Sequence, residues 1–296
     1  MPGKTRSRNR NINWALAWAR AYLNGQGIKD PYLDAQILLA HCLGMDIVGL
    51  YREGERQLSP QEKDAFCKLV QRRGKNEPVA YLTGRKEFMG LVYEVSRDVL
   101  IPRPETELLV EKALELYSKY WPGQPVIFAD IGTGCGNIAV SLARELPLSK
   151  IYAVDISPSA LIIAERNACV HRVWEKIIFS RGDLSAPLES LGLEGKINLI
   201  TANLPYIEST ETNSLMPDVG LYEPRQALDG GPDGLDLYRR LIPQSLRYLT
   251  KPGFLLMEIG PGQRMEITSY LAISGWKFEC LSDLAGRDRL VIACPK

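Results

Sequence analysis

Four consecutive residues, Asn203-Leu204-Pro205-Tyr206, are the strongest candidates for chemistry in this chain. They follow the apolar run 197–202, which predicts a buried strand, and the proline ends that strand because it has no N–H to donate. In open α/β sheets, ligands bind where the strands end. A side-chain amide beside an aromatic ring can hold a second planar amide or amino group at that edge. Taken alone, the four residues also fit an ordinary exit from a strand into a loop.

A glycine-rich loop between a predicted strand and a predicted helix is the second candidate, at residues 129–137. Its glycines allow a tight turn and a close approach of the backbone to a ligand. Asn137 stands where a dinucleotide site would have Gly or Ala, and no Lys-Ser or Lys-Thr pair follows as in a phosphate-binding P-loop. The helix N-terminus still favours an anion such as a carboxylate. The expected cofactor contacts are Gly132, Thr133, Gly134, Cys135 and Gly136.

Two carboxylates follow the next two predicted strands. Asp155 lies about 20 residues after the loop, where a carboxylate accepts hydrogen bonds from both hydroxyls of a ribose. Asp183, which precedes Leu184, ends the third strand, where it could accept from an adenine amino group. Together with the loop, these residues fit S-adenosylmethionine better than a nicotinamide cofactor. A solvated strand end is the alternative for Asp155 alone.

The elements that position these residues alternate between strand and helix from about residue 126 onward. Strands are expected over 126–130, 150–155, 176–180, 197–202 and 254–259, and near 277–281 and 290–293. Helices are expected over 138–146, 160–168, 235–249 and 263–273. This alternation predicts an α/β domain with a mostly parallel sheet covered on both faces, over residues 105–296.

Residues 1–83 contain helical patterns and no predicted strand, which indicates a small helical bundle as a separate domain. Its helices are expected over 12–24, 31–43 and 59–73, with Asp30 as the N-cap of the second and Ser59 and Glu62 as a capping box for the third.

Residues 84–104 are expected to form a hairpin around Gly90 and a connector that cannot be helical, because prolines follow Ile101 and Arg103. Arg103 is expected to face the substrate or to pair with Glu105 or Glu107.

Composition excludes several classes of protein. The formal net charge of +1 over 296 residues argues against direct nucleic-acid binding by the whole surface, although the basic stretch 1–10 fits a frayed terminus or, as the alternative, an RNA-touching arm. No apolar run is long enough to span a membrane. Six scattered cysteines and two histidines give neither a metal-binding spacing nor a disulfide framework, which predicts no metal and a reducing, cytoplasmic location.

The motif at 203–206 resembles the Asn/Asp-Pro-Pro-Tyr/Phe signature of S-adenosylmethionine-dependent methyltransferases that act on planar nitrogens. The tetrapeptide itself is similar to that of the ribosomal RNA adenine dimethyltransferases. Nearly the whole chain, however, resembles the release-factor glutamine methyltransferases of the HemK type. The stretches that carry this second resemblance are 78–84, 101–107, 130–134, 222–228, 230–231, 233–235 and 258–260. The stretch 258–262 also looks like the cofactor loop of the dimethyltransferases, but it follows the tetrapeptide instead of preceding it, so we interpret it as a later strand turning into a helix.

The resemblance implies a Rossmann-like methyltransferase domain with a seven-stranded, mostly parallel sheet behind a helical N-terminal domain. It also implies methyl transfer from S-adenosylmethionine, leaving S-adenosylhomocysteine, to the side-chain amide nitrogen (N5) of the glutamine in the Gly-Gly-Gln loop of class I peptide chain release factors. The helical domain is then expected to dock the release factor outside that loop. The alternatives are adenine-N6 methylation of ribosomal RNA and a catalytically weak, cofactor-binding partner in translation.

The resemblance also assigns roles to the motif residues. The Asn203 side-chain oxygen and the Leu204 carbonyl would each accept one N–H of the target –NH₂, and Asn203 would also contact the cofactor. Pro205 and Tyr206 match the family motif, with Tyr206 packing on the planar target. Catalysis of this kind depends mainly on orientation and desolvation. Two further residues, Glu223 and Pro224, are expected to shape the rim of the pocket. Leu204 departs from the family proline, which puts the precision of the pocket in question because leucine brings an N–H and a freer φ.

Overall fold

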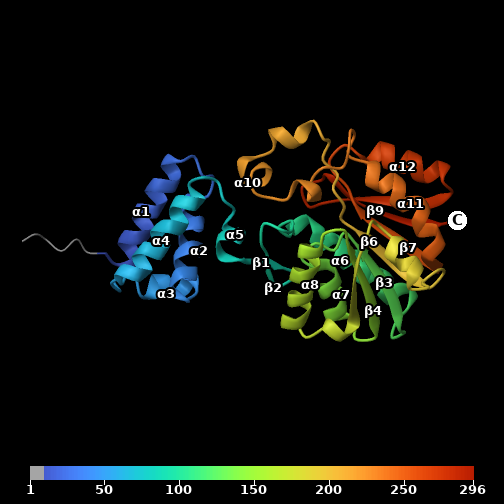
Figure 1. Cartoon of the computed structure of the whole chain (residues 1–296), viewed down its shortest axis with the longest axis horizontal. Helices are drawn as coiled ribbons and strands as arrows, with labels where there is room; N and C mark the ends of the chain where they lie inside the picture. Colours follow the sequence, from blue (N-terminus) through green and yellow to red (C-terminus); the bar gives the residue numbers. More distant parts are fainter. Residues whose placement is uncertain (1–9) are drawn as a thin grey trace, which may run out of the picture. The chain divides into compact units, whose positions relative to one another are not determined.

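The computed structural model describes residues 10–296, so the basic segment that the sequence predicts to be frayed lies outside the described residues except for its last member, Arg10. The chain forms two compact units, and Figure 1 labels their elements. The first unit runs to Gly84 and includes Pro217–Tyr222; the second comprises Arg85–Met216 and Glu223–Lys296. The short return of the chain into the first unit was not predicted from the sequence.

The first unit consists of helices. Their bounds are α1 (Ile12–Gly25), α2 (Pro31–Leu43), α3 (Ile47–Arg52), α4 (Pro60–Arg73), α5 (Val79–Thr83) and, from the returning segment, α10 (Pro217–Gly220). The predicted capping box of α4 is confirmed, since Ser59 and Glu62 exchange hydrogen bonds. Asp30 precedes α2 but makes no side-chain capping bond, because its ψ of 60° lies outside the extended range that such caps adopt.

A buried ion pair joins two helices of this unit. Asp34 of α2 accepts a hydrogen bond of 2.7 Å from Nε of Arg73 in α4. Burial raises the pKa of Asp34, while the hydrogen bond from Arg73 acts in the opposite direction. The returning segment is tied to the same unit by Tyr222, whose hydroxyl donates to the Lys75 carbonyl at 2.8 Å.

The second unit is built on a seven-stranded sheet in the order β5-β4-β3-β6-β7-β9-β8. The strands are β3 (Val126–Ile131), β4 (Ser149–Asp155), β5 (Ile177–Arg181), β6 (Ile197–Ala202), β7 (Leu249–Glu258), β8 (Trp276–Ser282) and β9 (Asp288–Pro295). The five strands from β5 to β7 in this order are parallel, and β9 pairs antiparallel with β7 and β8. The mostly parallel, seven-stranded sheet predicted from the sequence is therefore confirmed.

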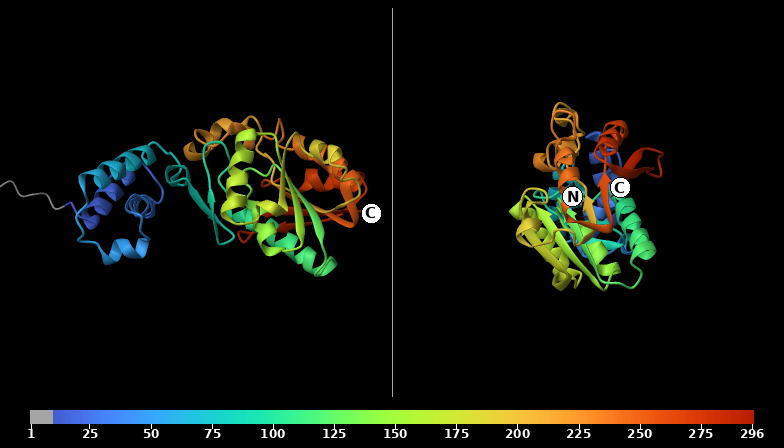
Figure 2. Two further views of the ribbon diagram at one scale, coloured as in Figure 1. Left: turned by 60° about the horizontal axis from the view of Figure 1, so that its bottom comes forward. Right: turned by 90° about the vertical axis from the view of Figure 1, so that its right-hand side faces the viewer.

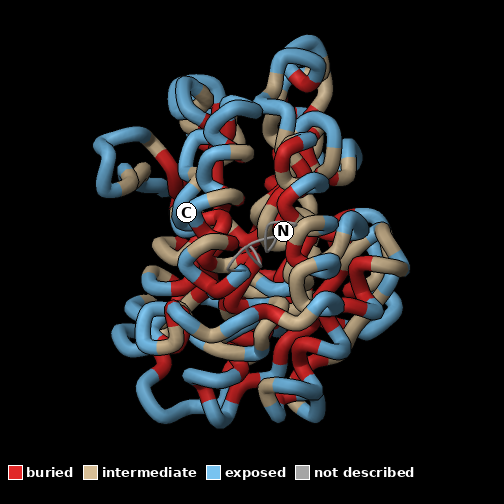
Figure 3. The backbone as a smooth tube through the Cα atoms, turned by 90° about the vertical axis from the view of Figure 1, so that its left-hand side faces the viewer, coloured by how far each residue is buried: buried red, intermediate tan, exposed pale blue. Residues whose placement is uncertain are grey.

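Helices cover both faces of the sheet, as the alternation of elements predicts (Figure 1). One face packs against α6 (Glu107–Tyr120), α7 (Asn137–Glu145) and α8 (Pro158–Val170). The other packs against α9 (Ala186–Ser190), α11 (Asp236–Tyr248) and α12 (Arg264–Ile273). Figure 3 shows buried residues along the inner segments of the backbone and exposed residues along the outer turns. The remaining short turns are η1 (Pro104–Thr106), η2 (Trp174–Lys176), η3 (Glu211–Ser214) and η4 (Arg225–Ala227).

A hairpin opens the second unit, as predicted, and lies beside α8 (Figure 2). It pairs β1 (Arg85–Phe88) with β2 (Leu91–Glu94), and the turn contains Gly90 with a φ of 68°. Asn167 of α8 joins the hairpin to the glycine loop, because its side-chain nitrogen donates to the carbonyls of Glu94 and Cys135 at 3.0 and 2.9 Å. No described helix has the length and apolar character that crossing a membrane requires.

Asp130 links two adjacent strands and the glycine loop. It is 1% exposed and accepts hydrogen bonds from the hydroxyls of Thr201 in β6 and Thr133 in the loop, at 2.8 and 2.7 Å. Burial raises the pKa of Asp130 to about 6, although both hydroxyls favour the charged form.

We expect Asp130→Asn to remove part of the pH dependence of stability. Because the pKa of Asp130 in the folded chain, about 6, lies above the ordinary value of 3.8, the stabilisation by the neutral carboxyl is complete below pH 3.8 and is lost as pH rises through about 6. Between about pH 5 and pH 8 the free energy of unfolding of the wild type should fall by roughly 1 kcal/mol more than that of the variant. Urea unfolding at both pH values measures the difference, with Asp98→Asn as the exposed control. An equal pH dependence in wild type and Asp130→Asn would contradict this assignment.

Candidate active site

The predicted site residues meet where β3 and β6 end side by side. Ile131 pairs with Ala202, so Gly132 and Asn203 leave the sheet at the same level. From β3 the chain moves to β4 and β5 on one side, and it returns to β6 on the other, which makes this edge the point where the strand order reverses. A cavity of about 1030 Å³ opens there, large enough for a cofactor together with a small group.

The glycine loop is held by backbone hydrogen bonds. The N–H groups of Gly132 and Thr133 donate to the Val154 carbonyl at 2.8 and 3.0 Å. Gly134 has a φ of 55°, and a Cβ placed on it would meet no described atom within 4 Å. Its backbone is therefore open to the cavity, and the loop has room for a ligand close to its main chain.

Gly136 has a different position from the other loop glycines. It has a φ of 81°, and a Cβ placed on it would lie 3.0 Å from the Cβ of Ala164 in α8. The absence of a side chain thus permits helix packing, and Gly136 does not line the cavity although the sequence predicts it as a cofactor contact.

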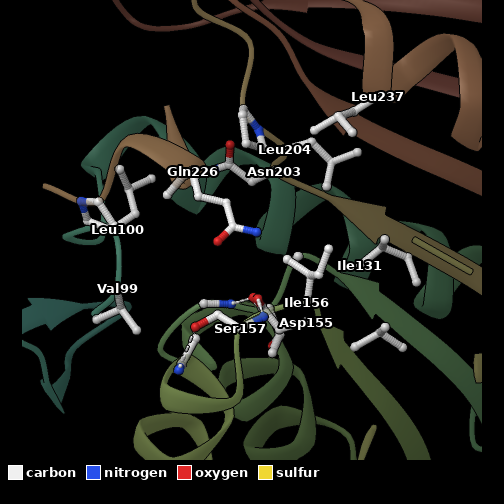
Figure 4. A pocket seen from close by; sticks show the side chains of 18 of the residues that line it. Val99, Leu100, Ile131, Asp155, Ile156, Ser157, Asn203, Leu204, Gln226 and Leu237 are labelled. Carbon is white, nitrogen blue, oxygen red and sulfur yellow. Dashed lines mark hydrogen bonds between the residues drawn. The ribbon is translucent and has the colours of Figure 1, made fainter. Parts of the chain in front are cut away.

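Asp155 ends β4 and lines the cavity opposite Asn203 (Figure 4). One carboxylate oxygen accepts from the Gly134 N–H at 2.8 Å and the other from the Ser157 N–H at 2.9 Å. Burial raises the pKa of Asp155, and these backbone donors oppose that shift. The carboxylate is therefore fixed in position at the cavity wall.

Asp183 follows β5 by two residues and also lines the cavity. Its carboxylate is hydrogen-bonded to the guanidinium of Arg240, and both side chains are about half exposed, at 48% each. This arginine partner was not predicted from the sequence. The neighbouring Leu184 is buried and contributes an apolar part of the wall.

Asn203 is oriented by a buried hydroxyl. Its Nδ2 donates to Oγ1 of Thr106 at 3.1 Å, and Thr106 in turn donates to Oε2 of Glu258 at 2.7 Å. Within residues 10–296, Oδ1 of Asn203 accepts no hydrogen bond. The side chain therefore keeps an unused acceptor at the cavity.

Leu204 is accommodated by two features that the motif alone does not reveal. Its N–H donates to the hydroxyl of Tyr238 at 3.3 Å, and that hydroxyl donates to the Glu258 carbonyl. A Cβ placed on Gly132 would lie only 2.9 Å from Cδ2 of Leu204, so the leucine side chain occupies space that the glycine leaves free. The N–H of Leu204 therefore has an acceptor, and its side chain has room beside Gly132.

Tyr206 stands behind the cavity wall. Pro205 lines the cavity, whereas Tyr206 does not. The hydroxyl of Tyr206 lies 3.5 Å from Oε1 of Glu258, and the backbone carbonyl of Tyr206 accepts a hydrogen bond from Nε2 of Gln263 at 2.9 Å. Burial first, and the Glu258 charge second, raise the pKa of Tyr206 to about 12. In this structure the ring supports the motif from behind.

Glu223 is also buried behind the rim formed by Pro224. It accepts from the Ile101 N–H at 3.2 Å and pairs with Arg103. The prediction that Arg103 pairs with Glu105 or Glu107 is wrong. Arg103 lines the cavity, and its other predicted role, facing the substrate, stays a prediction.

The two acidic residues after Arg103 have other partners because the chain turns into η1 immediately after it. Glu107 accepts from the Met89 N–H at 2.7 Å, and Glu105 pairs with Arg287 at 3.4 Å.

Much of the apolar wall was missed at the sequence level. Val99 and Leu100 come from the connector, and Leu237 comes from α11 (Figure 4). The side chain of Gln226 reaches into the cavity between Asn203 and Asp155 in the same view. The proline-rich connector was the one available signal for such a wall. Among the described residues, no group of three or more His, Cys, Asp or Glu side chains could hold a metal ion.

Comparisons with known proteins agree with the two-part organisation of the chain. A family model described as "PrmC N-terminal domain" matches residues 15–84, and one described as "Methyltransferase domain" matches residues 128–219. A Geobacter sulfurreducens protein named release factor glutamine methyltransferase is 40% identical over 282 residues, which is 95% of each chain. A protein of the same name from Moorella thermoacetica is 40% identical over 284 residues, covering 95% of this chain and 98% of the relative.

A solved structure, the hMettl16 catalytic domain in complex with the MAT2A 3'UTR hairpin 6, superposes with a TM-score of 0.58. It is 16% identical and covers 73% of this chain and 80% of that one, so the likeness concerns the fold alone. Together with the sheet order, the comparisons confirm the predicted methyltransferase fold class.

The pairing of Leu204 with Tyr238 can be tested by stability measurements. We expect Tyr238→Phe to lower the free energy of unfolding by about 1–3 kcal/mol, because it leaves a buried N–H and a buried carbonyl without partners. In a Leu204→Pro background the loss should be smaller, since the N–H is absent. Urea unfolding of wild type, both single variants and the double variant measures this coupling. Additive effects of the two substitutions would exclude the pairing.

Proposed function

The chain belongs to the release factor glutamine methyltransferase family, and we propose that it transfers a methyl group from S-adenosylmethionine to the side-chain amide nitrogen (N5) of the Gly-Gly-Gln glutamine in class I peptide chain release factors. The observation that carries this proposal is the side chain of Asn203, which lines a cavity bordered by the glycine loop and whose oxygen accepts no hydrogen bond within residues 10–296. We further propose that the reaction takes place in the cytoplasm, since the six cysteines are free and suit a reducing compartment.

The residues around the cavity suit the cofactor. The open backbone at Gly134, two residues before the N-cap of α7, offers a place for the carboxylate of the methionine part. Asp155 offers a fixed carboxylate for the ribose hydroxyls, and the apolar Leu184 and Ile156 offer a surface for the adenine ring. When bound, S-adenosylmethionine supplies an electrophilic methyl group on a positively charged sulfur.

The protein's part in the reaction is to hold the acceptor amide. Oδ1 of Asn203 accepts one N–H of the glutamine –NH₂, and the Leu204 carbonyl accepts the other. With both protons held, the lone pair of the nitrogen would be left free to attack the methyl group, and one of the two protons would leave the nitrogen as the N–CH₃ bond replaces the S–CH₃ bond. An amide nitrogen is a weak nucleophile, so orientation and exclusion of water supply most of the rate enhancement.

The helical unit is proposed to bind the release factor outside its glutamine loop. This proposal is supported by the match of residues 15–84 to the family's N-terminal domain. The exposed aromatic and apolar side chains of this unit, among them Tyr51, Val48 and Leu221, provide contact area of the kind found at protein interfaces. The proposed domain limits are 1–83 for this docking domain, 84–104 for the hairpin and connector, and 105–296 for the methyltransferase domain.

Mass spectrometry of a class I release factor after incubation with the protein and S-adenosylmethionine tests the reaction. We expect one added methyl group on the loop glutamine, and none when that glutamine is replaced. Asn203→Ala should lower kcat by at least about 100-fold while cofactor affinity stays within about twofold, because the amide acceptor acts on the substrate. An unmodified release factor alongside methylated ribosomal RNA would refute the proposal.

The cofactor assignment has a separate test. Asp155→Asn should weaken S-adenosylmethionine binding by about 10-fold or more, since the amide offers one acceptor where the carboxylate offers two. Isothermal titration calorimetry measures this, with Asp229→Asn as a control at another aspartate of the cavity rim. Equal affinity in wild type and Asp155→Asn would remove Asp155 from the cofactor site.

A further inference from the structure

Two buried polar residues, Thr106 and Glu258, have no role in the reaction described above, yet Thr106 is bonded to Asn203 and Glu258 is bonded to Thr106. They are 1% and 2% exposed and lie 152 positions apart in the chain, at the end of η1 and the end of β7. The hydroxyl of Thr106 stands between the Glu258 carboxylate and the Asn203 amide, at 2.7 and 3.1 Å. A buried polar group without a hydrogen-bond partner lowers the stability of the folded chain, so each of these groups constrains the position of its neighbour.

The direction of the two hydrogen bonds follows from the groups involved. A carboxylate only accepts, so the single hydroxyl proton of Thr106 must go to Glu258. The hydroxyl oxygen then has only acceptor capacity left for Asn203, and it can bond to Nδ2 but not to Oδ1. The other orientation of the carboxamide would bring two oxygens together.

We propose that Thr106 and Glu258 are positioning residues that fix the Asn203 side chain with its oxygen toward the acceptor amide. The inference rests on the proposed function, because it specifies how the amide-holding residue is set. With the carboxamide reversed, the –NH₂ of Asn203 would face the –NH₂ of the glutamine, and two donors would meet. The relay from Glu258 through Thr106 therefore selects the productive rotamer before the substrate arrives.

The charge of Glu258 is part of this device. Burial raises its pKa, whereas the Thr106 hydroxyl and Arg289 favour the charged form. The negative charge of Glu105 also raises the pKa of Glu258. The hydroxyl of Tyr206 lies beside the Glu258 carboxylate, and the hydroxyl of Tyr238 donates to the Glu258 backbone carbonyl. A neutral Glu258 could donate to Thr106, which would then donate to Asn203 and reverse the carboxamide.

Substitution at Thr106 tests the relay. Thr106→Val keeps the shape but removes the hydroxyl, and we expect kcat for the release factor to fall at least about tenfold, with S-adenosylmethionine affinity within about twofold of wild type. Thr106→Ser restores the hydroxyl and should recover kcat to within about threefold. Glu258→Gln, which can offer either an oxygen or an –NH₂ to Thr106, should also lower kcat without weakening cofactor binding.

A readout that needs no substrate separates this inference from the proposed function. In protein labelled with ¹⁵N-asparagine, the side-chain –NH₂ signal of Asn203 is identified by its loss in Asn203→Ala. We expect Thr106→Val to shift this signal, and Thr106→Ser to leave it close to its wild-type position. Thr212→Val is the matched control, because it removes another buried threonine hydroxyl, bonded to the Ser209 carbonyl at 2.8 Å, away from the cavity.

The outcomes are distinct. The positioning role would be overturned by an unshifted Asn203 signal in Thr106→Val or by a wild-type kcat in that variant. It would also be overturned if Thr106→Ser lowered kcat as much as Thr106→Val does. A wild-type protein that fails to methylate any release factor would instead refute the proposed function, and the Asn203 signal would still decide whether Thr106 sets the side chain.

Discussion

Burial of the Glu258 carboxylate is the constraint on which the arrangement of the site depends. An isolated buried carboxylate is costly, so the elements packed around β7 must present donors to it. Thr106 does so from η1, and Tyr206 approaches from the chain after β6. The Glu258 carbonyl is satisfied separately by Tyr238 of α11. One residue at the end of one strand thus joins η1, the motif at 203–206 and a covering helix.

The features that the sequence predicts well are those decided by neighbours in the chain. Apolar runs locate the strands, because a strand covered on both faces must be apolar throughout. The capping box at Ser59 and Glu62 is a contact over three positions, and the αL conformation of Gly44, which directly follows α2, is the usual way for a glycine to end a helix. The glycine loop and Asn203 could be brought together in advance because parallel strands place their carboxyl ends at one edge of the sheet.

The features that the sequence does not reveal are pairings between distant segments. Arg103 pairs with Glu223, 120 positions away, and Asp183 pairs with Arg240, 57 positions away. In each case nearer residues of opposite charge were available, and the tertiary packing decided which of them met. Tyr206 illustrates the same limit within a motif, because period and residue type place it after a strand but do not tell whether its ring faces the cavity or the core.

Leu204 shows why a departure from a motif must be judged together with its surroundings. A proline at this position would present no N–H, whereas leucine brings a donor into a buried place where an unpaired N–H costs free energy. The hydroxyl of Tyr238 accepts that donor, and Gly132 leaves room for the leucine side chain. The carbonyl that the motif needs is the same in both residues. Leucine at this position therefore changes the contacts behind the motif and leaves its carbonyl in place. For this reason the chain can depart from the double proline and still present the amide-binding edge that we propose.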